Sequence, residues 1–137
     1  MVLMSLQITS HAEKCSLMSQ DDVDAEEKVV VEGKTIYFCC GSCVTKFDQD
    51  QAYYIKAVKS LYDRFTPSER KKLGVDQVKL LDQRHCPVYP DRLVGPGSPT
   101  VEHKGQTIRL WSSSAVRRWT RDPSRYYDAA VAAGVLK

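Results

Sequence analysis

Hydrophobic and polar residues first alternate with the period of a strand and then with the period of a helix. Residues 28–31 and 35–38 are rich in valine and aromatic residues and lie on either side of the turn 32–34. Gly33, at the centre of this turn, can adopt the positive φ angle that a short connection needs. The segment therefore predicts a β-hairpin, followed by a helix with Cys43 in its first turn.

The same order of patterns returns in the second half of the chain. Residues 101–103 and 107–110 flank a turn centred on Gly105, and the helix expected after them has Ala115 in its first turn. The serines at 112–114 can cap that helix, because a serine oxygen accepts a hydrogen bond from its free N–H groups. Each half also begins with a cysteine-containing knuckle, followed by a variable loop, at 21–27 in the first half and 91–100 in the second.

Aligning residues 33–58 with residues 105–130 pairs more identical residues than ordinary composition predicts. The identical pairs include Gly33/Gly105, Thr35/Thr107, Ile36/Ile108, Val44/Val116, Asp50/Asp122, Tyr54/Tyr126 and Ala57/Ala129. Upstream of the hairpins, Cys15 aligns with Cys86 when the shift is reduced by one residue. We interpret this pattern as an internal duplication, in which each copy supplies a knuckle, a hairpin and a helix.

A structured linker is predicted between the two copies. Thr66-Pro-Ser-Glu69 has the pattern of a capping box with proline at the first helical position, and Gly74 is expected to end that helix. Apolar residues at 75, 78, 80 and 81 predict a second short helix over residues 75–83. The expected organisation is one unit over residues 1–65, a helical linker over 66–84 and a second unit over 85–137.

Composition is that of an ordinary globular protein and excludes few functions. The chain has 137 residues, of which 42% are hydrophobic and 27% are charged. No stretch approaches the ~20 apolar residues that a membrane span needs, and the first ten residues lack the basic start of a secretory signal. We therefore expect a reducing, cytoplasmic setting and no membrane partner. The net charge is +3, and residues 85–137, with 8 basic and 4 acidic side chains, form its basic part; we interpret this excess as a solvated face and not as a nucleic-acid footprint.

Five cysteines carry the strongest chemical signal. Cys39, Cys40 and Cys43 fall at the predicted corner between hairpin and helix, and Cys15 lies in the preceding knuckle. Clustered thiols without a secretory signal more often indicate metal or redox chemistry than a disulfide framework. Thiolates from the knuckle, the hairpin end and the first helical turn can occupy three corners of the tetrahedron that Zn²⁺ prefers. We therefore predict Cys15, Cys39 and Cys43 as metal ligands.

The role of Cys40 and the nature of a fourth ligand stay open. Successive side chains of an extended segment point in opposite directions, so Cys40 is retained only as a neighbour of the site or a substitute ligand. His11, the aspartates at 21, 22 and 24, water and a partner molecule are the candidates for a fourth position. Zn²⁺ is the favoured ion and Cu⁺ the alternative thiophilic one. The plain alternative is that these cysteines are small buried hydrophobic residues.

Three stretches carry a resemblance to a known family. They are Cys15-x-x-Met18, the run Gly-Lys-Thr-Ile-Tyr-Phe-Cys-Cys-Gly-Ser-Cys-Val-Thr-Lys-Phe over 33–47, and Asp-Gln-Asp-Gln-Ala-Tyr-Tyr over 48–54. Residues 15–56 resemble the YHS domain and the related TRASH-type heavy-metal-binding module, and the resemblance recurs weakly over 86–128. It implies treble-clef-like units of knuckle, hairpin and helix, and a role in sensing, handling or binding zinc, copper or similar ions.

The second copy departs from this pattern. It keeps Cys86 followed by Pro-Val, but it has Trp111 and Ala115 where the first copy has its second and third ligands. We therefore predict a degenerate, metal-free copy whose tryptophans provide packing. His85 and His103 are the side chains that could join Cys86 in a site of another kind.

Redox chemistry is one alternative function. Cys40-Gly-Ser-Cys43 is a Cys-x-x-Cys motif at a strand-to-helix corner, the setting that activates thiols in thioredoxin-like proteins. The absence of an upstream βαβ pattern and the repeated hairpin argue against it.

A nucleic-acid-binding zinc module is the other alternative. Arginines at 109, 117, 118, 121 and 125 are interleaved with Trp119, Tyr126 and Tyr127, an arrangement that can stack bases. Trp119 and Tyr126 align with Phe47 and Tyr54 of the first copy, however, which indicates core packing and disfavours nucleic acid as a partner.

No catalytic constellation is recognisable. The chain has three histidines, and it lacks a glycine-rich phosphate loop, a nucleophile elbow and a Glu–His pair at helical spacing. We expect a non-enzymatic protein whose partners are a metal ion and, where the site is left open, another protein. The sequence does not indicate an oligomeric state.

Overall fold

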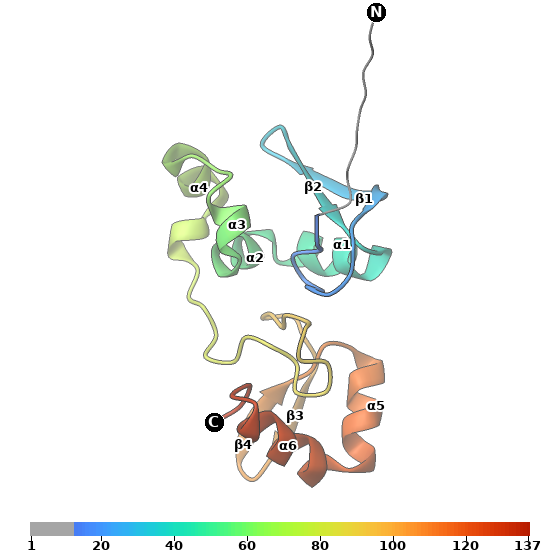
Figure 1. Cartoon of the computed structure of the whole chain (residues 1–137). Coiled ribbons are helices and arrows are strands. Elements are labelled where there is room, and N and C mark those ends of the chain that lie inside the picture. Colours follow the sequence, from blue (N-terminus) through green and yellow to red (C-terminus); the bar gives the residue numbers. More distant parts are fainter. Residues whose placement is uncertain (1–12) are drawn as a thin grey trace, which may run out of the picture.

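The structure is a computed structural model and describes residues 13–137. Within this range the chain forms two separate two-stranded antiparallel sheets and six α-helices (Figure 1). The expected α+β class is therefore confirmed. The first hairpin and helices α1–α4 form the upper part of Figure 1, and the second hairpin with α5 and α6 forms the lower part.

The first hairpin pairs β1 (Asp24–Val31) with β2 (Lys34–Phe38). Its two-residue turn has φ values of 48° at Glu32 and 76° at Gly33, the left-handed pair of a type I′ turn. Asp24 lies opposite Phe38, whereas Lys28 already lies opposite Tyr37, so the residues between them bulge out of register. With this bulge β1 begins at Asp24, so part of the segment 21–27, which we predicted as a loop, is strand. The predicted start of the strand was therefore wrong.

The second hairpin pairs β3 (Thr100–His103) with β4 (Gln106–Arg109) in a regular register. Its turn has φ values of 53° at Lys104 and 76° at Gly105, close to those of the first hairpin. Both predicted hairpins are thus confirmed.

Two helices follow each hairpin, separated by an aspartate. Helices α1 (Gly41–Gln49) and α2 (Gln51–Ala57) follow the first hairpin, and the four-residue helix α3 (Lys59–Tyr62) comes next. Helices α5 (Ser113–Arg121) and α6 (Pro123–Ala132) follow the second. The Ala115 N–H donates to Ser112 Oγ at 3.3 Å, which confirms the expected serine cap.

The linker agrees with the sequence in its first part only. Helix α4 (Pro67–Leu73) starts with the expected capping box between Thr66 and Glu69, and Gly74 ends it with φ of 77°. The predicted helix over 75–83 is wrong, because only a single 3₁₀ turn, η1 (Val75–Gln77), forms before Val78 becomes extended. In this extended chain the Gln83 amide group bonds both the N–H and the C=O of Arg109, at 2.8 and 2.7 Å, and so covers the edge of β4.

The knuckles at Cys15 and Cys86 have the same hydrogen-bond pattern and lie side by side. The Cys15 N–H donates to the Asp21 carbonyl at 2.9 Å, and the Cys86 N–H donates to the Arg92 carbonyl at 3.0 Å. Between the knuckles, the Leu93 N–H donates to the Leu17 carbonyl at 3.0 Å. The two halves are therefore joined by backbone hydrogen bonds as well as by the linker.

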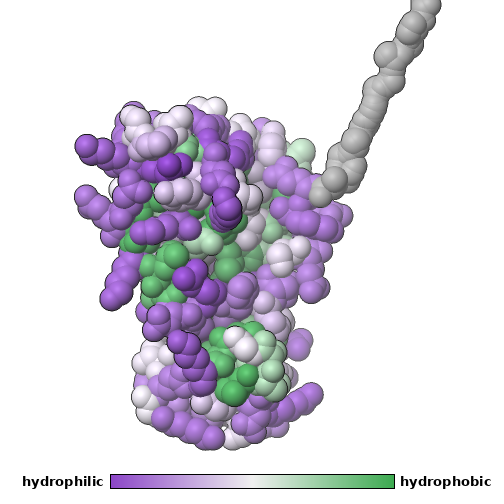
Figure 2. Space-filling view, turned by 60° about the vertical axis from the view of Figure 1, so that its left-hand side comes forward, coloured by the Kyte–Doolittle hydropathy of each residue, from purple (hydrophilic) through white to green (hydrophobic). Residues whose placement is uncertain are grey.

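One hydrophobic cluster extends through both halves. It includes Phe38, Phe47 and Tyr54 from the first half and Leu110 and Trp119 from the second. Figure 2 shows a face on which hydrophilic side chains surround smaller hydrophobic areas. None of the helices within residues 13–137 combines the length and the hydropathy that crossing a lipid bilayer requires.

Candidate metal centre

Cys15 is held in a tight turn of the first knuckle. Its N–H bonds the Asp21 carbonyl, and the Asp21 N–H donates back to the Met18 carbonyl at 3.0 Å. These two bonds close the knuckle and turn the Cys15 side chain inward, where the residue is 1% exposed. The backbone of the knuckle therefore fixes the first predicted ligand.

The other thiols lie at the corner between β2 and α1. The strand ends at Phe38, and Cys40 is the residue before the helix, with an extended backbone. The Cys43 N–H donates to the Cys40 carbonyl at 3.2 Å, so Cys43 lies in the first helical turn and is fully buried. This is the strand-to-helix corner that the sequence predicts.

The sulfur atoms of Cys15, Cys39 and Cys43 converge. All three lie within 4.8 Å of one another, and the Cys39 and Cys43 sulfurs are 3.6 Å apart. Two sulfurs bound to one ion at about 2.3 Å in tetrahedral geometry are separated by about 3.8 Å. The geometry of the three predicted ligands thus fits a shared metal ion.

Cys40 lies at the margin of this group. Its sulfur is 3.7 Å from that of Cys39 and 3.9 Å from that of Cys43. It is not part of the three-sulfur group that lies within 4.8 Å. The structure thus brings Cys40 close to two ligands and leaves it outside the common centre.

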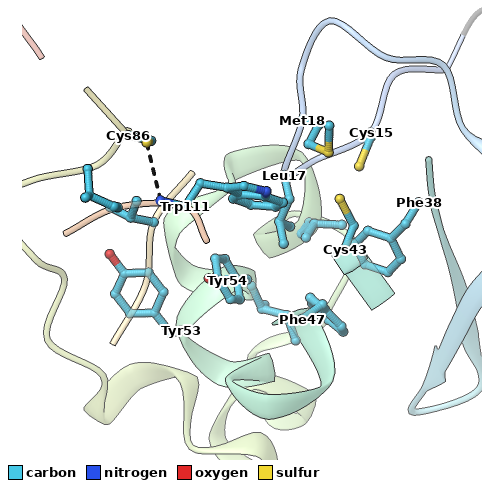
Figure 3. Close-up of a cluster of buried hydrophobic side chains, with 14 of the residues drawn as sticks. Cys15, Leu17, Met18, Phe38, Cys43, Phe47, Tyr53, Tyr54, Cys86 and Trp111 are labelled. Carbon is cyan, nitrogen blue, oxygen red and sulfur yellow. Dashed lines mark hydrogen bonds between the residues drawn. The ribbon is translucent and has the colours of Figure 1, made fainter. Parts of the chain in front are cut away.

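Aromatic and aliphatic residues enclose the sulfur cluster. The Phe38 and Phe47 rings pack with their centroids 5.1 Å apart, and neither residue is exposed. In Figure 3 the Cys15 and Cys43 sulfurs point toward the same region, with Met18 beside Cys15 and Phe38 beside Cys43. Water is largely excluded on this side, so charges within the cluster interact strongly.

The thiols influence one another's ionisation. A hydrogen bond from Cys43 lowers the pKa of Cys15 to about 5, against the opposing effect of burial. Burial and the charge of Cys15 raise the pKa of Cys39 to about 12. The hydrogen bond to Cys15, burial and the charges of Cys15 and Cys39 raise the pKa of Cys43. Of the three converging thiols, Cys15 is therefore the one most readily deprotonated.

Cys40 behaves differently. Burial acts to raise its pKa, but hydrogen bonds with the Cys43 backbone and the Cys39 side chain outweigh this effect, and the pKa of Cys40 is lowered. Burial is the main cause of the raised pKa of Cys39, and the hydrogen bond to Cys15 is the main cause of the raised pKa of Cys43; the negative charge of neighbouring thiols adds to both. A bound cation would offset that charge and favour the thiolate forms. The donor set therefore suits a thiophilic metal ion.

The aspartate candidates for a fourth ligand, at 21, 22 and 24, do not join the cluster. Asp22 pairs with Lys14 at 2.7 Å, and an Asp24 carboxylate oxygen accepts from the Glu26 N–H at 2.9 Å. Within residues 13–137, the group of side chains able to hold a metal ion consists of the three cysteines alone, without a carboxylate or imidazole. His11 lies outside the described residues.

The sequence analysis missed one sulfur atom. Met18 Sδ lies 3.5 Å from Cys39 Sγ, as close as the thiols lie to each other, and Met18 is 8% exposed. From the sequence, Met18 was notable only as part of the family pattern Cys15-x-x-Met18. A position near the thiols was not predicted for it, because a methionine beside apolar residues usually indicates core packing.

The second half uses its cysteine for packing. The Trp111 N–H donates to Cys86 Sγ at 3.3 Å, drawn as the dashed line in Figure 3, and burial raises the pKa of Cys86. His103 packs against Trp119 and Tyr127, at 5.5 and 4.8 Å between ring centroids. The described residues form no metal-binding group around Cys86, so His85, Cys86 and His103 are not brought together.

The aromatic residues considered for base stacking are engaged elsewhere. Trp119 is 2% exposed and stacks with Tyr126, at 6.5 Å between their ring centroids. Trp119 is therefore not available to stack on a base beside the surface arginines. This agrees with the prediction that Trp119 and Tyr126 pack in the core.

Comparison of the chain with protein-family models, with curated proteins and with solved structures gives no match.

Proposed function

We propose that this chain is a non-enzymatic protein that binds one thiophilic metal ion through Cys15, Cys39 and Cys43. The observation that carries the proposal is the meeting of three sulfur atoms from the knuckle, the hairpin end and α1 within 4.8 Å. A set of soft donors in an enclosed apolar site favours Zn²⁺, the ion expected from the sequence, or Cu⁺ over harder cations. Metal sensing or handling, in a reducing compartment, is the role we assign to it.

The proposal extends to two related units, one over residues 1–65 and one over 85–137, with 66–84 as linker. Support comes from the matched left-handed turns at Gly33 and Gly105 and the matched knuckle hydrogen bonds of Cys15 and Cys86. Each unit has the order knuckle, hairpin, helix that a treble-clef-like, YHS-type module requires. The second unit, which has Trp111 and Ala115 in place of Cys39 and Cys43, covers apolar surface of the first.

Cysteine substitution tests the metal proposal. We expect the protein purified without chelator to contain one metal ion per chain by elemental analysis, and Cys15→Ser or Cys43→Ser to remove most of it. Both variants should also lose the metal-dependent increase in thermal stability, because metal binding and folding are coupled.

Cys86→Ser is the matched control, since Cys86 occupies the equivalent knuckle without being near the cluster. It should keep the full metal content even though it weakens the contact with Trp111. Full metal content in Cys15→Ser or Cys43→Ser would contradict the ligand assignment.

A thiol redox role is the second candidate, favoured by the lowered pKa of the half-buried Cys40 and its 3.9 Å separation from Cys43. It predicts a reversible Cys40–Cys43 disulfide in a protein that takes up no metal. Metal uptake that survives Cys40→Ser would argue against it.

A further inference from the structure

We infer that Met18 is a fourth, thioether ligand of the centre and that it makes the site selective for a soft monovalent ion, Cu⁺, over Zn²⁺. The inference rests on the proposed metal-binding function and adds the class of ion to it. Its basis is the position of Met18 Sδ, 3.5 Å from Cys39 Sγ.

Met18 and Cys15 belong to the same knuckle, whose backbone holds Met18 in place. The Asp21 N–H holds the Met18 carbonyl, and Met18 also forms an antiparallel bridge with Arg92 of the second half. The backbone of Met18 is therefore held from two sides. Figure 3 shows its sulfur on the side of the residue that faces Cys15 and Cys43.

The separations suit coordination. The Met18–Cys39 distance of 3.5 Å and the Cys39–Cys43 distance of 3.6 Å both lie near the edge of a tetrahedron of sulfurs around one ion, about 3.8 Å. Cys40 also lies near two ligands, yet it is outside the group that includes Cys15. Met18 comes from the same knuckle as Cys15, and this distinguishes it from Cys40 as the fourth donor.

The chemical type of the fourth donor determines which metal ion the site prefers. Zn²⁺ in proteins takes thiolate, imidazole or carboxylate ligands, and the described residues place neither of the last two in the cluster. Thiolates suit both ions, whereas a thioether is not among the usual protein ligands of Zn²⁺, so a Met18 ligand favours Cu⁺. In the second half, Tyr89 stands where Met18 stands in the first, so the half that lacks counterparts of Cys39 and Cys43 also lacks the thioether.

Met18→Leu tests the inference in the full-length, reduced protein, because leucine keeps an apolar side chain of similar volume and removes only the sulfur. Affinities for Cu⁺ and Zn²⁺ are measured by competition with chromophoric chelators. We expect a loss of Cu⁺ affinity of about tenfold or more, the size seen when supporting groups around metal sites are removed, with Zn²⁺ affinity changed by less than about twofold. Cys40→Ser, which alters the rival donor, should change neither affinity.

A second readout follows the sulfur itself. In protein labelled with ¹³C at the methionine methyl groups, the Met18 signal, assigned through Met18→Leu, should shift with Cu⁺ and stay in place with Zn²⁺. Equal losses for both ions, a loss in Cys40→Ser instead, or an unmoved Met18 signal would overturn the inference and leave the three-thiolate centre intact. Failure of the unaltered protein to bind either ion would refute the proposed function itself.

Discussion

At the scale of single residues, Gly95 allows the two halves to approach closely. A Cβ atom at this position would lie 2.5 Å from the Tyr54 hydroxyl oxygen and 2.8 Å from the ring carbon that carries it. Tyr54 belongs to α2, is 2% exposed and packs edge-to-face with Tyr53. The ring cannot move away without disturbing the core, so the absence of a side chain at Gly95 is a packing requirement.

Gly95→Ala should therefore destabilise the protein by about 1–3 kcal/mol, the usual cost of inserting a methyl group into a packed region. Chemical denaturation with a two-state fit measures this loss. Gly41→Ala is the control, because its Cβ would meet only a Glu27 carboxylate oxygen at 3.7 Å, an ordinary contact. Equal stability of the two variants would contradict the packing at Gly95.

Some of the residues at the candidate metal centre and at the junction of the two halves were predictable from the sequence, and others were not. Cys15, Cys39 and Cys43 were predictable because thiols are rare and their spacing matches a knuckle and a strand-to-helix corner. The close approaches of Met18 and Gly95 were not, because a methionine usually packs in a core and a glycine before a proline usually marks a loop. Their roles arise from contacts with distant segments.

At the scale of secondary structure, Glu69 ties α4 to the first hairpin. Its carboxylate accepts from the Thr66 N–H at 2.8 Å within the capping box and pairs with Lys34 Nζ of β2 at 2.7 Å. The hydrogen bond from Lys34 is the main cause of the lowered pKa of Glu69, followed by that from Thr66. One carboxylate therefore both starts the helix and attaches it to the sheet.

Glu69→Gln should lower the thermal midpoint at pH 7, and this effect should shrink as the pH falls below 4.5. The folded-state pKa of Glu69 lies below its unfolded value of 4.5, so its stabilisation is complete above pH 4.5 and is lost as the pH falls through the folded value. Thermal melts across pH 3–7 measure the difference. Asp63→Asn, which removes an exposed pair with Lys59, is the control and should have a smaller effect. A difference in thermal midpoint between wild type and Glu69→Gln that stays the same at acid pH would contradict the stabilising role of the Glu69 carboxylate.

Elements with their own turn or cap chemistry were predictable from sequence. The type I′ turn at Gly33 and the capping box at Thr66 are local, and both appear as expected. The failed helix over 75–83 depended on non-local contacts, because Gln83 bonds the backbone of Arg109 and keeps that segment extended. The bulge that lengthens β1 likewise reflects its pairing with β2, which hydrophobic periodicity does not encode.

At the scale of the whole molecule, the candidate metal centre lies near the junction of the two halves. Met18 bridges to Arg92, and Lys46, one turn after Cys43 on α1, stacks on the Trp111 ring at 4.6 Å. Trp111 in turn bonds Cys86 of the second knuckle. The second half thus supports the elements that carry the ligands without supplying a thiol. This arrangement was not predictable, because the patterns in the sequence do not indicate how the two halves pack.

X-ray absorption at the metal edge of the loaded, full-length protein tests the central claim most directly, because it counts the sulfur atoms that share one ion. Cys15, Cys39 and Cys43 come from three different elements, so only the folded chain can bring them together. We predict at least three sulfur neighbours at about 2.3 Å around a single metal ion. A first shell made up of oxygen and nitrogen, or one with a single sulfur, would contradict the account.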